Sequence, residues 1–233
     1  MAGNGNRKLE RYLASEPLPE VEEDGLLSDV AYARLLDALR HGGFKPGDNL
    51  STNRISQLLG ISRTPVSQAV RRLAQEGIIE IIPGHSISVA APSFQEALDS
   101  VDVRMLLEPN QAALVAGRLP PDAQAQLLET LDLMEQAAEA DDRGAWSRAD
   151  TVYHEILSTY CPNKYLAQLV MQFRNRVLRT VTDQYTSKQY ILDGTAEHRR
   201  IAEAVIAGDS QLAEELMLTH MQNVRKNMLG RFS

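Results

Sequence analysis

The sequence predicts a mainly α-helical fold in two parts, and three observations carry this prediction. Apolar residues recur at helical spacing over most of the 233 residues. Two adjacent β-branched runs, separated by Gly and Pro, lie between residues 78 and 90 and are typical of a hairpin. From residue 95 onward, helical patterns follow one another with short breaks and without strand signals. We therefore expect a small N-terminal domain that contains the hairpin, followed by an all-α antiparallel bundle of about six helices.

Composition and charge limit the possible functions. A hydrophobic content of 43% is normal for a globular protein with a packed core. The net charge of −7 argues against indiscriminate nucleic-acid binding, because Lys and Arg supply the affinity for phosphate. Residues 1–90 carry 10 Lys+Arg and 11 Asp+Glu (net −1), and the remainder carries 14 and 20 (net −6). Between Leu50 and Ser86, however, four Arg face two Glu, so this short segment has a basic local balance.

The chain shows no sign of export or membrane insertion. Its single cysteine, Cys161, cannot form an intrachain disulfide, which is consistent with a reducing compartment. The polar start lacks the apolar core of a signal peptide, and no stretch reaches membrane-spanning length. We expect a cytoplasmic protein with no membrane partner. Residues 1–25, with the acidic run Glu20 to Asp24, are expected to be a loosely ordered arm, or an arm lying on the neighbouring domain.

The N-terminal domain is expected over residues 26–91, with a supporting helix from Val30 to Leu39 and a turn from Phe44 to Asp48. Two short helices then fit Arg54 to Arg72. In the first, Ile55, Leu58 and Leu59 share one face, and Gly60 provides the freedom for a sharp turn.

The second helix is expected to begin at Ser62, a suitable N-cap, with Pro65 in its first turn. Val66, Val70 and Leu73 face inward at i, i+4, i+7. The outward face is polar and basic and comprises Ser62, Arg63, Thr64, Ser67, Gln68 and Arg71. Such side chains can bond base edges or phosphates when a helix lies in the major groove. On periodicity alone, an ordinary solvated helical hairpin is an equal alternative.

The next residues favour DNA binding. The helix ends near Gly77, and the runs Ile78 to Ile82 and Ile87 to Ala90 then flank the sequence Pro83 to Ser86. A helix-turn-helix followed by such a hairpin is a winged helix. The wing tip commonly touches the minor groove or the DNA backbone, so we place His85 near the backbone.

A linker over residues 92–94 leads to an all-α domain over residues 95–230. Breaks at Gly, Pro and Asp separate its helices. The expected helices run from Phe94 to Ala116, from Pro120 to Ala140, from Ala145 to Thr159, from Lys164 to Thr182, from Gly194 to Ala207 and from Ser210 to Leu229.

Three of the five histidines, His154, His198 and His220, lie in these predicted helices. Asp150 precedes His154 by four residues, so both side chains project from one face, with Cβ atoms about 5 to 6 Å apart. One metal ion can bridge that gap. Imidazole and carboxylate suit Zn, Ni, Mn or Fe, and burying them is costly unless something pairs with them. Three unrelated helical histidines are the alternative.

Two regions of the chain resemble known families. Residues 28–91 resemble the GntR family of bacterial transcription regulators, through the runs Lys45 to Leu50, Leu59 to Val66 and Leu73 to Ile78. Residues 95–229 resemble the ligand-sensing FCD domain that defines the FadR-like subgroup of that family. The matching motifs are Arg104 to Glu108, Asp150 to His154, Cys161 to Leu166, Glu197 to Ile201 and Met217 to His220.

The second resemblance implies a metal site. In metal-containing members, the Asp and His of the D-x-x-x-H helix and two later His bind a divalent ion. The corresponding residues of this chain are Asp150, His154, His198 and His220. Zinc is the first expectation for the metal, and nickel, manganese or iron are alternatives.

The effector expected from this resemblance is an organic acid whose carboxylate reaches the metal. Arg104 resembles the family arginine that would hold its other end, and Asn163 is a candidate hydrogen-bonding partner. The alternative cations for holding the effector are Arg174, Arg176 and Arg179. The other interpretation of these three arginines is a solvated or dimer-facing stripe.

The function expected from both resemblances is a DNA-binding transcription regulator, acting as a repressor. A homodimer would read a near-palindromic operator. The small-molecule effector would favour one of two arrangements of the helical bundle and so alter the relative placement of the two winged helices. Two alternatives remain: a metal-dependent hydrolase or lyase at the same Asp/His site, which lacks a recognisable general base, and a DNA-binding protein with a purely structural metal.

One departure from the family pattern concerns the recognition helix. The family usually has a second arginine where this chain has Ser67, and an alanine where it has Ser56. Arg63 therefore becomes the main base-reading candidate, and we expect an operator that differs from the common half-site.

Overall fold

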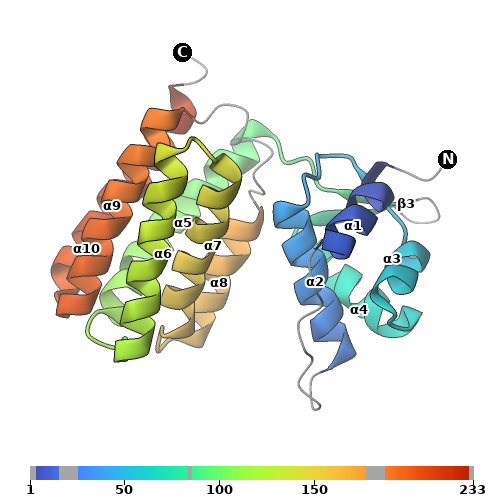
Figure 1. Ribbon diagram of the computed structural model, residues 1–233, viewed down its shortest axis with the longest axis horizontal. Helices are drawn as coiled ribbons and strands as arrows, with labels where there is room; N and C mark the ends of the chain where they lie inside the picture. Colours follow the sequence, from blue (N-terminus) through green and yellow to red (C-terminus); the bar gives the residue numbers. More distant parts are fainter. Residues whose placement is uncertain (1–3, 16–25, 83–85, 177–186, 231–233) are drawn as a thin grey trace. The chain divides into compact units, whose positions relative to one another are not determined.

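The computed structural model describes residues 4–15, 26–82, 86–176 and 187–230 (Figure 1). The chain divides into two compact units between Ser93 and Phe94, and each unit has its own hydrophobic core. The mainly α fold class predicted from the sequence is confirmed.

The N-terminal unit is a winged helix-turn-helix with an additional first helix. Its helices are α1 (Asn4–Ser15), α2 (Leu27–His41), α3 (Thr52–Leu59) and α4 (Arg63–Gln75), and its strands are β1 (Asn49–Leu50), β2 (Ile79–Ile82) and β3 (Ser86–Val89). The strands form an antiparallel sheet in the order β1-β3-β2, in which Leu50 lies opposite Ile87 and Ile79 opposite Val89.

The turn between α3 and α4 forms as the sequence predicts. Gly60 adopts the left-handed conformation at φ 65°, which costs a glycine little. The Ser56 hydroxyl donates to the carbonyl oxygen of Ile61 at 2.6 Å and so ties the end of α3 to the turn. Val66 and Leu73, expected to face inward, are buried in the core of this unit. The departure at Ser56 therefore has a local structural role.

The helix α1 corrects the expectation of a loosely ordered arm over residues 4–15. Leu9, Tyr12 and Leu13 recur at i, i+3, i+4 and face the core of the N-terminal unit, with Leu9 only 1% exposed. The alternative expectation, an arm lying on the neighbouring domain, describes these residues better. The remainder of that arm, residues 16–25, lies outside the described residues.

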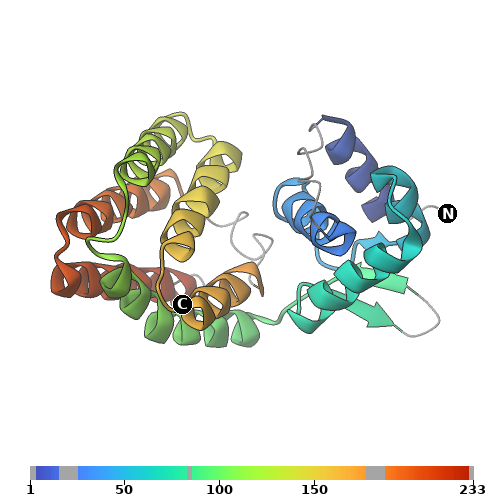
Figure 2. The same cartoon turned by 90° about the horizontal axis from the view of Figure 1, so that it is seen from below.

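The C-terminal unit consists, over its described residues, of six helices, the number expected. They are α5 (Phe94–Val115), α6 (Pro121–Glu139), α7 (Arg143–Thr159), α8 (Lys164–Arg176), α9 (Lys188–Ala207) and α10 (Ser210–Leu229). Figures 1 and 2 show α5 beside α10, and α6 beside α7 and α9. None of the described helices in either unit has the length and apolarity to cross a membrane.

In the C-terminal unit, the start of α9 differs clearly from the predicted one. The helix α9 begins at Lys188 rather than at Gly194, because the Ser187 hydroxyl caps it by accepting a hydrogen bond from the Tyr190 amide. Gly194 lies inside the helix and is buried, so it does not mark a break; an added Cβ would make only an ordinary contact, 3.8 Å from the Trp146 ring. The predicted end of the fourth helix at Thr182 lies outside the described residues.

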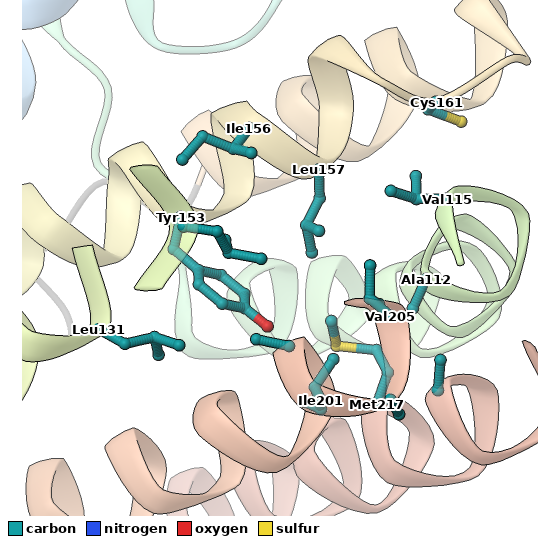
Figure 3. Close-up of a cluster of buried hydrophobic side chains, with 14 of the residues drawn as sticks. Ala112, Val115, Leu131, Tyr153, Ile156, Leu157, Cys161, Ile201, Val205 and Met217 are labelled. Carbon is teal, nitrogen blue, oxygen red and sulfur yellow. The ribbon is translucent and has the colours of Figure 1, made fainter. Parts of the chain in front are cut away.

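The core of the C-terminal unit fixes α7 against α9. Tyr153 and Leu157 point from α7 toward Ile201 and Val205 of α9, and these side chains are buried (Figure 3). The Tyr153 hydroxyl donates to the backbone oxygen of His198 at 3.1 Å. The two helices that carry the expected metal ligands are therefore held in register by buried contacts.

Candidate metal centre and nucleic-acid interface

Three of the four expected metal ligands converge in the C-terminal unit. Asp150 and His154 project from one face of α7, and His198 reaches them from α9. The Asp150 Oδ1 atom lies 3.6 Å from His154 Nε2 and 3.4 Å from His198 Nε2, and the two Nε2 atoms are 3.1 Å apart. Both imidazoles are buried, at 0% and 1% exposure. The three groups offer ligand atoms within 4.8 Å of one another.

Both imidazoles are neutral at pH 7. Burial and the nearby His220 hold the pKa of His198 well below its usual range. Burial and the charge of Arg174 lower the pKa of His154 to about 4. His198 Nδ1 lies 2.7 Å from the carbonyl oxygen of Gly194, which can only accept, so Nδ1 carries the proton and Nε2 presents a lone pair.

No tautomer of His154 satisfies both of its nitrogens. With the proton on Nε2, His154 can donate to His198, but its buried Nδ1 then turns a lone pair toward Glu108 Oε2 at 3.7 Å and has no hydrogen-bond partner among the described residues. With the proton on Nδ1, the lone pairs of both Nε2 atoms face each other at 3.1 Å. A cation between the two Nε2 atoms and Asp150 would remove this repulsion.

The spacing of these donor atoms fits a first-row divalent ion. Metal–nitrogen and metal–oxygen bonds of about 2.0 to 2.2 Å place neighbouring ligand atoms about 3.0 to 3.5 Å apart in octahedral or tetrahedral sites. The three observed separations are 3.1, 3.4 and 3.6 Å. Two imidazole nitrogens and one carboxylate oxygen are also the donors that zinc, nickel, manganese and iron accept.

His220, the fourth expected ligand, lies beside this group on α10. Its ring centroid is 4.5 Å from that of His198. Its nitrogens, however, do not lie within 4.8 Å of the ligand atoms of all three residues Asp150, His154 and His198. Its Nδ1 donates to Glu197 at 2.6 Å, which leaves Nε2 to act as a ligand. Asn223 donates to the other Glu197 oxygen. Burial would raise the pKa of Glu197, but the hydrogen bonds from His220 and Asn223 and the nearby positive charge together outweigh it, and the pKa is lowered.

Two arginines and a buried glutamate adjoin the ligand group. Arg104 Nε donates to Glu108 at 2.6 Å, and Arg174 lies 3.4 Å from both Glu108 oxygens and 2.8 Å from Asp150 Oδ2. Burial opposes ionisation, but Arg104 and Arg174 hold the pKa of Glu108 below its usual range. Arg174 does the same for the pKa of Asp150. With neutral imidazoles, the two arginines and two carboxylates cancel to a net charge of zero.

The residues expected to bind an effector are not all brought to this group. Arg104 reaches it through Glu108, and Arg174, an alternative on sequence grounds, contacts Asp150 directly. Asn163 is exposed, and its Oδ1 accepts from the Leu166 amide at the start of α8. It lies about 16 Å along that helix from Arg174 at the rise of an α-helix.

The remaining arginine alternatives lie away from the group or outside the described residues. Arg176 is exposed and lies over the Phe173 ring at 5.8 Å, and Arg179 is outside the described residues. Sequence reasoning missed Glu108 as a functional candidate. The available signal was its position four residues after Arg104, on the same face of α5.

The expected DNA-reading face lies on the N-terminal half of α4. Its exposed members are Ser62, Arg63, Thr64, Gln68 and Arg71, while Ser67 is half-buried. Arg72 turns away: it stacks on Tyr32 at 3.7 Å and pairs with Asp29 and Glu76. His85, expected near the DNA backbone, lies outside the described residues.

Comparison with known proteins gives matches over both units. The family described as bacterial regulatory proteins, gntR family, matches residues 27–89, and the FCD domain matches residues 99–223. An uncharacterised HTH-type transcriptional regulator from the TAR-I ttuE-ttuC' intergenic region of Agrobacterium vitis is 31% identical over 61% of this chain and 88% of its own length. The HTH-type transcriptional regulator LutR of Bacillus subtilis is 26% identical, covering 83% of this chain and 97% of its own.

A further relative and a solved structure are also similar to this chain over most of its length. The HTH-type transcriptional repressor GlaR of Escherichia coli is 24% identical over 82% of this chain and 90% of its own length. The structure of McbR/YncC from E. coli superimposes with a TM-score of 0.78 at 20% identity, covering 90% of this chain and all of that one. This second likeness concerns the fold alone.

Proposed function

The chain belongs to the GntR family of bacterial regulatory proteins and carries an FCD domain, and from this premise we propose that a carboxylate metabolite at a divalent metal centre controls its binding to DNA. Like its relatives, it is a DNA-binding transcription regulator and not an enzyme. The observation that carries the metal proposal is the convergence of two neutral imidazoles and Asp150, in which no arrangement of protons satisfies His154.

Asp150, His154 and His198 would hold the ion, with His220 as the fourth ligand. A carboxylate, that of Glu108, lies 3.7 Å from His154 Nδ1, which is beyond hydrogen-bond distance. The other two imidazoles have a hydrogen-bond acceptor behind Nδ1: the Gly194 carbonyl for His198 and Glu197 for His220. Such acceptors fix the tautomer that directs Nε2 toward a metal. The ion, with zinc as the first expectation, supplies positive charge and open positions for carboxylate oxygens.

The charge balance supports an anionic effector. The two arginines and the carboxylates of Glu108 and Asp150 cancel without metal, and Glu197 behind His220 adds one negative charge, so a divalent ion leaves a net charge of +1, which is costly to bury without a counter-charge. An organic acid with one or two carboxylates would supply that charge. We expect Arg174, at 13% side-chain exposure and 2.8 Å from Asp150, to meet the acid beside the metal, with Arg104 behind Glu108.

We further propose a cytoplasmic homodimeric repressor. A single recognition helix contacts few base pairs, so two copies on a near-palindromic operator are needed for specificity. Large apolar side chains are exposed on two neighbouring helices, Leu106 on α5 at 71% and Tyr165 and Leu169 on α8 at 80% and 43%, so we propose α5 and α8 as the dimer face. A repressor role is supported by GlaR, which is named a repressor.

Metal binding can be tested with the chain's single tryptophan. Trp146 lies edge-on to the His198 ring, with centroids 6.5 Å apart, so Ni²⁺ or Co²⁺ bound there should quench its fluorescence. We expect one ion per chain by elemental analysis, and loss of both signals in Asp150→Asn and His198→Gln. His41→Gln, in the other unit, is the control. Equal metal content in all four proteins would overturn the metal proposal.

Regulation can be tested by mobility shift on the DNA flanking the protein's own gene. Metal-loaded protein should bind it, and some small carboxylates should change the affinity, whereas metal-free protein should not respond to them. If the affinity stays the same with every carboxylate while metal removal unfolds the C-terminal unit, the metal is purely structural. A sugar or an acyl-CoA acting in place of carboxylates would contradict the effector class.

A further inference from the structure

The recognition surface on α3 and α4 has few cations left for DNA. The described segment between Leu50 and Val89 contains four arginines. Arg72 is engaged with Asp29, Glu76 and the Tyr32 ring, and Arg54 pairs with Glu10 at 2.7 Å. Arg63 and Arg71 remain. Phosphate contacts by Lys and Arg supply most of the non-specific affinity for DNA, so two arginines are a small number for such a surface.

The helix α1 packs closely against α3 and β1. Lys8 pairs with Asp48 at 2.6 Å, and the amide of Ser51, the residue just before α3, donates to Asn6 Oδ1 at 3.0 Å. Gly5 packs so closely that an added Cβ would lie 2.4 Å from the Asn49 carbonyl oxygen. Together with the buried Leu9, these contacts give α1 a defined position, which both views of the ribbon show alongside α3 (Figures 1 and 2).

The outward face of α1 is basic. Arg7 and Arg11 are exposed at i and i+4, so they project from the same side of the helix. Within the described part of the chain, neither guanidinium forms an ion pair. Glu10 lies between them and is paired with Arg54 of α3. The exposed charges of α1 and of the adjoining Arg54 therefore sum to +2.

We propose that α1 is part of the DNA-binding surface and that Arg7 and Arg11 contact the phosphate backbone beside the recognition site. In a helix-turn-helix the first helix, here α3, crosses the DNA backbone while the second enters the major groove. A helix fixed against α3 with two unpaired guanidiniums facing outward adds charge next to that crossing. The GntR match begins at residue 27, so α1 lies outside it, and the inference rests only on the DNA-binding function.

The test is the salt dependence of DNA binding by Arg7→Ala/Arg11→Ala. The DNA probes are a duplex of random sequence and a duplex selected from a random pool by the wild-type protein. The slope of log K against log salt should fall in magnitude by about 2 per bound subunit, which corresponds to a loss of about 60-fold at about 0.1 M salt. The loss should be equal on both duplexes, because phosphate contacts carry no sequence information.

Two further variants separate charge from structure. Arg7→Lys/Arg11→Lys keeps the charge and should keep the wild-type slope. Arg118→Ala/Lys226→Ala removes the same charge from exposed positions of the C-terminal unit and should also leave the slope unchanged. Circular dichroism should be the same for all of these proteins, since the altered side chains are exposed.

The inference is overturned if the alanine variant binds with the wild-type slope and affinity, or if the lysine variant loses as much as the alanine variant. Failure of the wild-type protein to bind either duplex would instead overturn the DNA-binding function itself.

Discussion

Glu108 is the buried charge on which the electrostatics of the candidate metal centre depend. It is 0% exposed and lies between Arg104 and Arg174. Glu108→Gln leaves two arginines with the single carboxylate of Asp150, and removing one partner of a buried ion pair costs about 3 to 5 kcal/mol. We expect a loss of about that size in the free energy of unfolding, measured by urea denaturation of the metal-free protein.

The matched control for this change is Asp132→Asn. Asp132 also pairs with an arginine, Arg199 at 2.7 Å, but its side chain is 61% exposed. Solvent screens such a pair, so its loss should cost less than about 1 kcal/mol. Equal losses in the free energy of unfolding for the two variants would show that burial does not make the Glu108 ion pairs more important for stability than an exposed pair.

The buried imidazoles also make a prediction for pH. In the unfolded chain both have a pKa of about 6.5, whereas the folded pKa is about 4 for His154 and well below 6.5 for His198. Between these values the unfolded chain binds protons that the folded protein excludes. The free energy of unfolding of the metal-free protein should therefore fall as the pH is lowered from about 6.5 toward 4, by up to about 1.4 kcal/mol per pH unit for each imidazole.

The measurement is urea denaturation at a series of pH values after removal of metal. His154→Gln removes one of the two titrating groups and should show about half the slope. Above pH 7 both histidines are neutral in either state and contribute no slope. A stability that stays level from pH 7 to 5 would contradict the burial of neutral imidazoles.

At the scale of single elements, α4 carries the sequence-specific contacts. Arg63 is exposed at its first turn, and the half-buried Ser67 lies one turn later on the same side. Arg63→Ala should abolish specific binding, because a bidentate arginine–guanine contact is worth about 1 to 3 kcal/mol in each half-site. Ser67→Arg should shift the base preference, measured by selection from a random DNA pool.

Gln75→Ala provides the control on the same helix. Gln75 is exposed at the other end of α4, about 18 Å from Arg63 along the axis, so its removal should change neither affinity nor preference. If Ser67→Arg selects the same sites as the wild-type protein, the assignment of this face of α4 to base reading is wrong.

For the whole molecule, two separate cores predict two unfolding transitions. One core belongs to the N-terminal unit and the other to the helical unit that contains the candidate metal centre. A ligand stabilises the part of the protein that binds it when folded. Calorimetry with and without Zn²⁺ should therefore show one transition that moves to higher temperature and one that does not.

Trp146 identifies which transition moves. It is the only tryptophan and lies in the helical unit, where its indole nitrogen donates to Thr195, so its fluorescence should follow the zinc-sensitive transition. A single transition with and without zinc, followed alike by fluorescence and calorimetry, would contradict independent folding of the two units.

Features that depend on local spacing could be predicted from the amino-acid sequence. The turn at Gly60, the inward residues of α4 and the shared face of Asp150 and His154 all follow from helical periodicity, and the helix from Ser210 to Leu229 has the predicted bounds. These features involve neighbours within one or two turns of chain, so residue types and their spacing are sufficient to predict them.

The meeting of groups that are distant in the sequence is visible in the folded protein alone. The packing of the bundle accounts for it. It placed His198 of α9 against the pair on α7, put Arg174 and not Asn163 beside Asp150, and joined Glu108 to both arginines. Whether an imidazole is neutral, and which nitrogen keeps its proton, depends on burial and on partners from other helices. Those are properties of the packed bundle, and the spacing of residues along one helix does not contain them.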